Sequence, residues 1–360
     1  MTEQTPSPRP KKIMQEANKV DSPPAADFPD FQLRQLGRLE RWLGQERYQL
    51  VRGIFTNPLS VVGLILVLFF VLAAAFAPAL APPLDAASDP YLIPRDGFSP
   101  EPKPPGALWK RDTPPLPDWY EVVTGKDHWV HLMGTASGQF DIYYGIVWGS
   151  RTALFVGVFI TAITVFIGVV IGAVSGFYGG LIDDGFMRIT EIFMAFPFLL
   201  AAMTLSAILV PIFGRGIWPA TIALIVFGWM TYARVIRAEI FSTKERDFVL
   251  AARVIGARDS RLLFKHIIPN AIYPILILAS MRVGDYVLSF ATLSFLGVGT
   301  DIGYADWGQI ISFARDWIMS LDKHWYIVFF PGMALLLFGL GWNLIGDALR
   351  DIMDPRLRKG

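Results

Sequence analysis

The sequence predicts an all-α integral membrane protein with about six transmembrane helices. Hydrophobic residues make up 53% of the 360 residues, including 27 Phe and 11 Trp, which is more apolar surface than a soluble core needs. Six apolar runs each have about the 20 residues that are needed to cross a bilayer. Lys and Arg are concentrated in three segments outside those runs, so the pattern also predicts an orientation.

The six runs share a length near that of a membrane span. They lie at about 59–80, 152–177, 189–212, 217–239, 271–298 and 325–348. The basic segments are the N-terminal tail, the loop after the fourth run and the C-terminal end. By the positive-inside rule all three are cytoplasmic, so both termini are expected inside and the loops at 81–151 and 299–324 outside. We therefore expect a multi-pass protein of the cell (inner) membrane.

The chain then divides, in order, into five predicted regions. These are a cytoplasmic tail (1–57), the first transmembrane helix (58–81), an extracytoplasmic loop or cap (82–150), a five-helix core (151–350) with a cytoplasmic loop at 241–270, and a second cytoplasmic tail (351–360).

The N-terminal tail does not have the pattern of a signal peptide, because the first apolar run begins only near Leu59. Its polar, proline-rich part up to about Asp30 is expected to be disordered. The segment Phe31–Arg52 interleaves Leu and Trp with Arg and predicts a basic amphipathic helix. Such a helix could lie on the inner membrane surface or dock on its own protein.

The first outer loop combines many prolines with aromatic residues. The prolines disfavour regular helix, and Trp109, Trp119, Tyr120 and Trp129 could pack the loop into a small cap. His128 and His131, three residues apart, would suit a metal site or a structural turn. We favour the turn and assign no metal, because the sequence has no cysteine and few carboxylates lie nearby.

Two local patterns predict how helices pack and bend. Gly168, Gly172 and Gly176 are four residues apart and form a stripe on which another helix can approach closely. Pro197 should kink the third apolar run. Arg234 and Arg237, at the end of the fourth run, can extend their side chains to the inner headgroups.

The loop after the fourth run is the polar hinge of the chain. Its first part suits a helix up to Ile255, because Phe248, Ala251, Ala252 and Ile255 recur at spacings of three and four and share a face. Gly256 should end that helix in a positive-φ conformation. A second short helix is expected from near Ser260 to just before Pro269.

This loop resembles the cytoplasmic EAA loop of ABC importer permeases. The similarity lies in Ala251-Ala252, then Gly256, then His266-Ile-Ile-Pro269, with Leu250 in place of the glutamate that gives the loop its name. Three further segments resemble the C-type subunit of dipeptide, oligopeptide and nickel importers. They are His131–Thr152, Asp183–Pro197 and the ending Trp342–Arg358, and the resemblance as a whole covers about 55–80 and 131–358.

The resemblance implies a type I ABC importer permease architecture with an extended outer loop. It also implies a second permease subunit, two ATPase subunits and an extracytoplasmic substrate-binding protein as partners, besides the lipid bilayer and without nucleic acid. Peptides would cross by alternating access, although members also carry nickel chelates, opines or sugars. The residues that would couple ATP hydrolysis to transport are Asp247, Ala251, Ala252, Gly256, Ala257, His266 and Pro269.

The chain is not expected to be an enzyme or to hold a cofactor. Gly125-Lys126 is followed by Asp127 and lacks the earlier glycine of a phosphate loop. No catalytic or cofactor-binding residue is assigned, and ATP and Mg are expected in the partner subunits.

Arg282 and Asp285 lie three residues apart in the fifth run and therefore on one helical face. Arg282 stands about 17 Å along a helix that starts at Ala271, which is near the middle of a hydrocarbon core about 30 Å thick. The two charges should therefore face the bundle interior or a wet cavity. They are either a structural ion pair or, with Met281 and Ser289, part of the transport pathway.

Two other classes of function remain open at this point. A self-sufficient secondary transporter or channel would show inverted repeats and would work alone. A membrane receptor or scaffold would make the proline-rich outer loop its main feature.

Overall fold

The computed structural model describes residues 57–85, 87–111 and 113–353. The predicted disordered tail, the predicted amphipathic helix at Phe31–Arg52 and residues 354–360 lie outside this range. Within it the secondary structure is helical, and β pairing is limited to isolated bridges.

Five helical segments are long and apolar enough to cross a bilayer by themselves. They are α4 (Pro58–Ala75), α7 (Ile142–Tyr178), α10 and α11 together (Ile217–Gly228 and Met230–Lys244), α15 (Tyr273–Phe295) and α18 (Tyr326–Met353). The bent pair α8 (Gly180–Met194) and α9 (Phe198–Phe213) is long and apolar enough to be a sixth if the two helices form one span. The prediction of an all-α membrane protein with about six crossings is confirmed.

The remaining helices are short and lie in the connections. They are α5 (Ala77–Leu80), α6 (Asp118–Thr124), η1 (Ser137–Gln139), α12 (Asp247–Val254), α13 (Asp259–Arg261), the π-helix η2 (Leu262–Ile267), α14 (Ile268–Ala271), α16 (Trp307–Ser312), η3 (Phe313–Ser320) and α17 (Leu321–His324).

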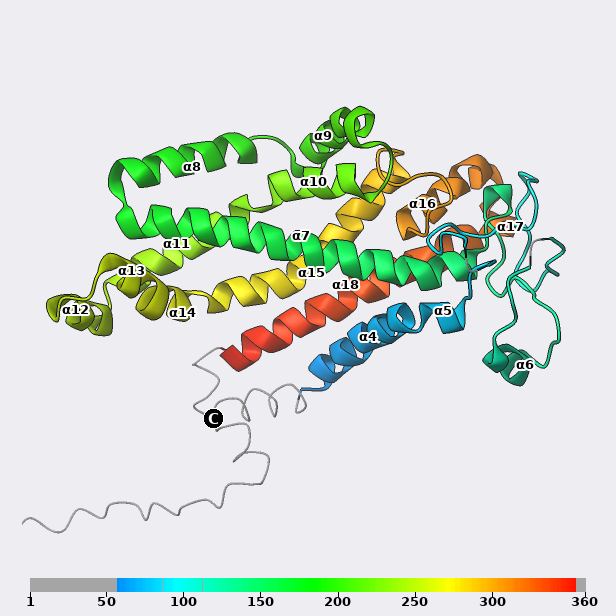
Figure 1. Cartoon of the computed structure of the whole chain (residues 1–360), viewed down its shortest axis with the longest axis horizontal. Coiled ribbons are helices and arrows are strands. Elements are labelled where there is room, and N and C mark those ends of the chain that lie inside the picture. The colour runs from blue at the N-terminus through cyan, green and yellow to red at the C-terminus, as the bar shows by residue number, and fades with distance from the viewer. Residues whose placement is uncertain (1–56, 86, 112, 354–360) are drawn as a thin grey trace, which may run out of the picture. The chain divides into compact units, whose positions relative to one another are not determined.

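Helix α7 is the axis of the bundle. It packs against α4, α10, α11 and α15, and Figure 1 shows it running from the outer loops to the end that carries α12. It begins well before the predicted start at 152, because the Asp141 side chain accepts a hydrogen bond from the Tyr144 amide and caps the first turn. One helix therefore links the two ends of the bundle.

The glycine stripe of α7 is the contact surface for α11. A Cβ atom on Gly168 would lie 2.5 Å from Cβ of Tyr232, and one on Gly176 would lie 2.9 Å from the carbonyl oxygen of Arg237. Only glycine permits this approach, so the predicted helix packing is confirmed.

The predicted kink at Pro197 is a complete break. Helix α8 ends at Met194, α9 starts at Phe198, and their axes meet at 85°. Pro197 has an extended ψ of 119° and lacks the amide proton that a continuous helix would need. The third crossing therefore changes direction, which leaves hollows between α8, α9 and the α10–α11 segment.

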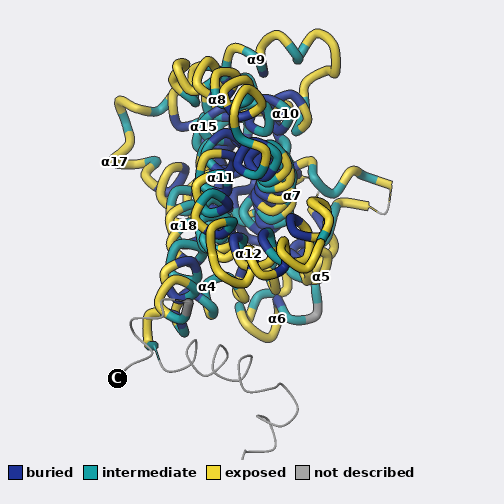
Figure 2. The backbone as a smooth tube through the Cα atoms, turned by 90° about the vertical axis from the view of Figure 1, so that its left-hand side faces the viewer, coloured by how far each residue is buried: buried dark blue, intermediate teal, exposed yellow. Residues whose placement is uncertain are grey.

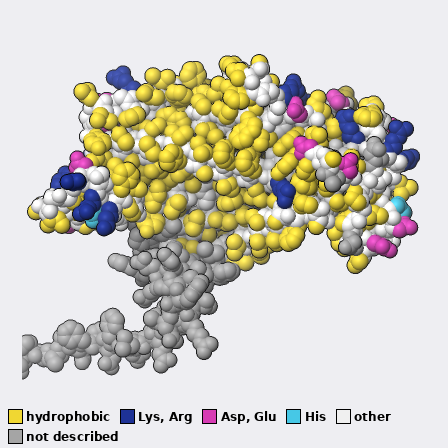
Figure 3. Space-filling model, in the orientation of Figure 1, with side chains coloured by type: hydrophobic (Ala, Val, Ile, Leu, Met, Phe, Trp, Pro, Cys, Tyr) yellow, Lys and Arg dark blue, Asp and Glu magenta, His cyan; other side chains and the backbone are white. Residues whose placement is uncertain are grey.

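The burial pattern fits a membrane bundle. Figure 2 shows buried backbone along the inner helices and exposed backbone on the outer surfaces. In Figure 3 hydrophobic side chains cover the middle of the visible face, while charged side chains gather mostly toward the two ends. An apolar surface of this extent is expected where acyl chains surround the protein.

The two loops that the sequence predicts to lie outside fold together into one cap. Tyr91 stacks on Tyr304 with ring centroids 5.5 Å apart, and Leu92 and Tyr304 form an isolated bridge. Tyr120 and Trp129 are buried against Trp109 and Trp119, as the aromatic content of the first loop predicts. Residues more than 200 positions apart in sequence thus form one structure at the start of α7.

Candidate functional site

The loop between α11 and α15 has the break that Gly256 predicts. Helix α12 ends at Val254, and Gly256 has φ of +86°, in the left-handed region that favours glycine. The second helical part does not stop before Pro269, and that prediction is wrong. It continues through α13 and the π-helix η2 into α14, where Pro269 occupies the first turn and its missing amide proton is not needed.

The loop is fixed to the bundle by a small apolar core. Val249 and Ala252 of α12 and Leu262 of η2 are buried against Ile236 and Ile240 of α11. Of the four residues that the sequence places on one face, only Ala252 is buried. The buried face of α12 is turned by one residue, so that Val249 rather than Phe248 packs inward.

The tip of the loop exposes large apolar side chains. Val254 is 87% exposed, Ile255 86% and Phe264 70%. The same loop also exposes four basic side chains, namely Arg253, Arg258, Arg261 and Lys265. Figure 1 shows α12 projecting at the end of the bundle away from the cap. Periodicity did not predict this tip, because it placed Ile255 on the same face as Ala252, which is buried.

The seven coupling candidates from the sequence have different positions in this loop. Asp247, Ala251, Gly256 and Pro269 are exposed, whereas Ala252 is buried and Ala257 and His266 are half-buried. Asn270 donates a side-chain hydrogen bond of 2.7 Å to the His266 carbonyl and supports that turn. The structure thus gathers the seven residues in one compact loop, with Ala252 in its interior and the exposed ones on its surface.

Arg282 and Asp285 of α15 form the expected pair. The Nη1 atom of Arg282 lies 3.4 Å from Oδ2 of Asp285, and the side chains are 40% and 52% exposed. Ser289 donates its hydroxyl to the Asp285 carbonyl oxygen at 2.8 Å. Met281 lies against Gly346 of α18. Three of the four pathway candidates therefore share an open face of α15, while Met281 packs on a neighbouring helix.

Arg282 faces a cavity of about 400 Å³ between three parts of the bundle. Helix α15 contributes Arg282 and Tyr286, and the Tyr286 hydroxyl donates to the Gly228 carbonyl oxygen at 3.1 Å. The other lining residues come from the α8–α9 bend and from α10–α11 and are Phe193, Met194, Phe196, Pro197, Phe198, Phe227, Gly228, Met230 and Thr231. A cation and a row of aromatic rings thus line one space.

An ion pair ties α8 to α11. The Arg237 guanidinium donates through Nε and Nη2 to the Asp183 carboxylate, which also accepts from the Ser175 hydroxyl of α7. Lys244 donates to the Gly176 carbonyl oxygen at 3.2 Å. Arg237 is thus held by Asp183, which lies 54 residues away in sequence.

A buried polar cluster holds the cap on the start of α7. His131 lies between two carboxylates, with Nδ1 2.7 Å from Asp141 Oδ2 and Nε2 3.1 Å from Asp96 Oδ2. Asp96 also accepts from Lys103 and from the amides of Lys110 and Arg111. Burial alone would raise the pKa of Asp96, but these hydrogen bonds outweigh it and hold the pKa below the usual carboxyl value.

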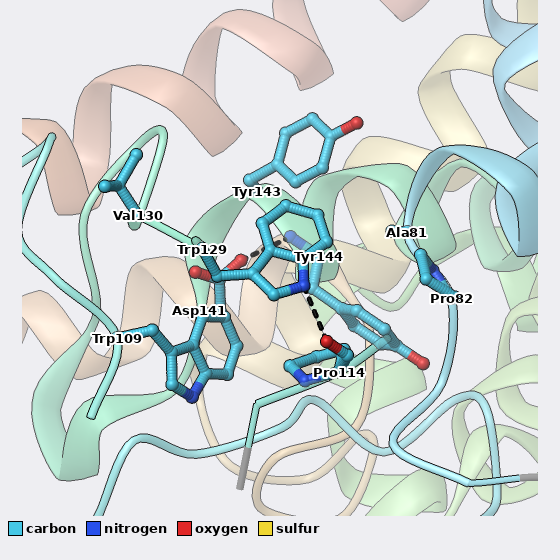
Figure 4. Close-up of a pocket in the computed structure, with 9 residues that line it drawn as sticks. All are labelled: Ala81, Pro82, Trp109, Pro114, Trp129, Val130, Asp141, Tyr143 and Tyr144. Carbon is cyan, nitrogen blue, oxygen red and sulfur yellow. Dashed lines mark hydrogen bonds between the residues drawn. The ribbon is translucent and has the colours of Figure 1, made fainter. Parts of the chain in front are cut away.

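His128 and His131 do not share a site. His128 pairs with Asp127 at 2.7 Å on the surface, whereas His131 is buried. The Trp129 indole between them donates to the Pro114 carbonyl at 2.7 Å, as Figure 4 shows. The hollow around Trp129 measures only about 10 Å³, so side chains fill it and leave no room for a cargo molecule.

Two family models match parts of the chain. The model of the family "Binding-protein-dependent transport system inner membrane component" matches residues 168–359. The model "N-terminal TM domain of oligopeptide transport permease C" matches residues 48–99.

Individual relatives are similar in sequence to this chain over most of its length. A dipeptide transport system permease protein of Alkalihalophilus pseudofirmus is 33% identical over 84% of this chain and 87% of its own length. An oligopeptide transport system permease protein of Bacillus subtilis is 34% identical over 84% and 88%. A dipeptide transport system permease protein of Escherichia coli is 35% identical over 84% and 91%.

Proposed function

This chain belongs to the family of binding-protein-dependent transport system inner membrane components and is a permease subunit of an ABC importer, and we propose that it forms half of a pore for peptides. The family consists of transport permeases, not enzymes, and a multi-pass helical member lies in the inner membrane. An EAA loop with a coupling helix is typical of it. The sequence relatives named for dipeptides and oligopeptides support the choice of cargo.

The observation that carries the coupling proposal is the exposed apolar tip of the loop. Val254, Ile255 and Phe264 would stay in contact with water unless a partner covered them, and such a patch is typical of an interface. The exposed arginines and lysine of the same loop suit a partner with an acidic rim. The partner is an ATPase subunit, which supplies the ATP and Mg chemistry that this chain lacks. The complete importer has two ATPase subunits, a second permease subunit and an extracytoplasmic binding protein.

The anchoring of the loop supports alternating access. Val249 and Ala252 pack in the same apolar core as Ile240 of α11 and Ile275 of α15. Closure of the two ATPase subunits would therefore move the loop together with both helices. Helix α15 also carries Arg282, Asp285 and Ser289, so the same motion would open or close the cavity at Arg282.

The orientation follows from the charged loops. Asn57 Nδ2 lies 3.4 Å from Asp351 Oδ2, so the start of α4 and the end of α18 meet. We place this end and the coupling loop in the cytoplasm and the cap outside, where it can meet the binding protein. A cysteine introduced at Ser99 of the cap should react with an impermeant thiol reagent on intact cells. Reaction only after the membrane is opened would reverse the orientation.

Reconstitution tests the function itself. The chain is purified with its partner permease, the two ATPase subunits and the binding protein, and uptake of the solute retained by that binding protein is measured in proteoliposomes. We expect uptake of a peptide that requires ATP and every subunit. Uptake by this chain alone, without ATP, would instead favour a self-sufficient secondary transporter or channel.

A further inference from the structure

A groove between α8 and α11 continues from the Arg282 cavity toward the coupling loop. A second cavity, of about 500 Å³, lies beside the first. Phe193 and Met194 of α8 line the first cavity, and residues one to three turns earlier in α8 line the second. Arg234 of α11 marks the boundary, because its Nη1 atom lies 3.4 Å from the sulfur of Met194. The two spaces thus adjoin along the same pair of helices.

The second cavity is lined mostly by charged and polar side chains. They are Asp184, Met187, Arg188, Thr190, Glu191, Arg234 and Arg237. Arg237 is already bound by Asp183. Within residues 57–85, 87–111 and 113–353, Arg188 and Arg234 have no carboxylate within 4.0 Å. The sulfur that Arg234 contacts is a weak acceptor, so its guanidinium retains donors for another group.

Both arginines lie within the length of their helices and not at the helix ends. Arg234 lies about 15 Å from the end of α11 at Lys244, and Arg188 about 12 Å from the start of α8, at a rise of about 1.5 Å per residue. Within the apolar part of a bilayer a charged side chain that faced acyl chains would be strongly unfavourable, so such residues normally face a water-filled space or a solute. The groove that begins at Arg282 is a space of this kind.

We propose that Arg188 and Arg234 form an anion-binding station in the part of the pathway next to the coupling loop, where they bind the C-terminal carboxylate of the cargo peptide. This inference rests on the proposed function and adds the group of the substrate that is recognised. A guanidinium binds a carboxylate through two parallel hydrogen bonds, which an amide cannot accept in the same way. The aromatic rings of the adjoining cavity would hold apolar side chains of the same peptide.

The test compares a peptide with its C-terminal amide. Uptake of both is measured in proteoliposomes with the complete complex, for the natural chain and for Arg188→Gln combined with Arg234→Gln. The binding protein is the same throughout, so the ratio of variant to natural uptake for each peptide isolates the contribution of the permease. Arg215→Gln is the control, because Arg215 is exposed and lies outside both cavities.

We expect the double variant to lose about tenfold or more of free-acid uptake, since hydrogen bonds to charged groups are among the stronger ones. Uptake of the amide should change little, and Arg215→Gln should change neither. Arg234→Lys keeps the charge but loses the paired donors, and should lower free-acid uptake selectively even if the glutamine variants assemble poorly. If the double variant reduces uptake of the free acid and of the amide equally, or reduces neither, the proposal that Arg188 and Arg234 bind the carboxylate fails.

Vesicle composition separates the cargo from a lipid headgroup. If the deficit of the double variant disappears in vesicles of phosphatidylcholine without anionic lipid, the arginines bind lipid phosphate and the proposal fails. A deficit that persists there supports it. Failure of the natural complex to import either peptide would instead refute the proposed function, so the two failures are distinguishable.

Discussion

A Cβ atom placed on Gly172 of α7 would lie 2.2 Å from the carbonyl oxygen of Ala233 in α11. Because backbone cannot move aside like a flexible side chain, α7 and α11 can pack only while position 172 lacks a Cβ. This one contact joins the axis of the bundle to the helix that leads into the coupling loop.

Replacing Gly172 by Ala should therefore destabilise the bundle. Overpacking of this kind costs about 1–3 kcal/mol. Thermal unfolding of the purified protein in detergent measures the effect. Gly185→Ala is the matched control, because Gly185 is helical and has no atom within 4 Å of a built Cβ. Equal melting temperatures for the two variants would show that α7 and α11 do not pack as closely as described.

The conformation of Gly256 allows a separate test of the coupling loop. A Cβ there would meet no atom within 4 Å, so only the positive φ of +86° opposes a side chain. A β-branched residue in this conformation costs about 1–2 kcal/mol, while Asn tolerates it. Gly256→Val should reduce binding of the ATPase subunits and stimulated ATP hydrolysis, and Gly256→Asn should come close to the natural chain. If the valine variant assembles normally and shows normal stimulated ATP hydrolysis, the proposal that this loop binds the ATPase subunits is wrong.

Asp306 predicts a pH dependence of stability. It caps α16 through the amides of Gly308 and Gln309 and lies outside the candidate membrane spans. Burial raises its pKa to about 6, and the hydrogen bonds that it accepts offset only part of this effect. The folded-state pKa is above the unfolded value, so this contribution to stability is fully present below pH about 4 and is lost as the pH rises through about 6.

Asp306→Asn should therefore stabilise the protein at pH 7.5, by at most about 3 kcal/mol for a shift of two units. Asn keeps an oxygen that can cap the helix and removes the buried charge. The gain, measured by thermal unfolding, should shrink below pH about 6 and vanish near pH 4. Asp306→Ala also removes the helix cap. Its free energy of unfolding should therefore be about 0.5–2 kcal/mol lower than that of Asp306→Asn at every pH. A gain from Asn that is the same at pH 4 and pH 7.5 would contradict the buried-charge argument.

The pair Arg282 and Asp285 distinguishes a structural role from a transport role. Half-exposed ion pairs contribute only about 0–1 kcal/mol, so replacing both by Met and Ala should change the melting temperature little. If the pair lines the pathway, uptake by the double variant should fall although the complex assembles. Asp285→Ala alone should also lower stability by no more than about 1 kcal/mol, because the half-exposed cation of Arg282 remains in contact with water. Normal uptake by the double variant would leave the pair with a structural role only.

Local chemistry determined much of the architecture before any tertiary structure was considered. The number of crossings follows from counts of apolar residues, because a span of fixed length needs only a fixed number of them. Gly256 and Pro197 mark breaks, because their backbone preferences act within one or two residues. The stripe at Gly168, Gly172 and Gly176 is visible because helical periodicity repeats every three to four residues.

Only the tertiary structure decided which of these surfaces meet. Nothing in the sequence pairs Asp183 with Arg237, or brings Asp96 to His131, since each pair is separated by more than one helix or by a long loop. In the coupling loop, too, only the tertiary structure shows that Val249 faces inward and that Val254 and Ile255 face out. Periodicity shows which residues share a face of a helix, but the partner of that face depends on the path of the whole chain.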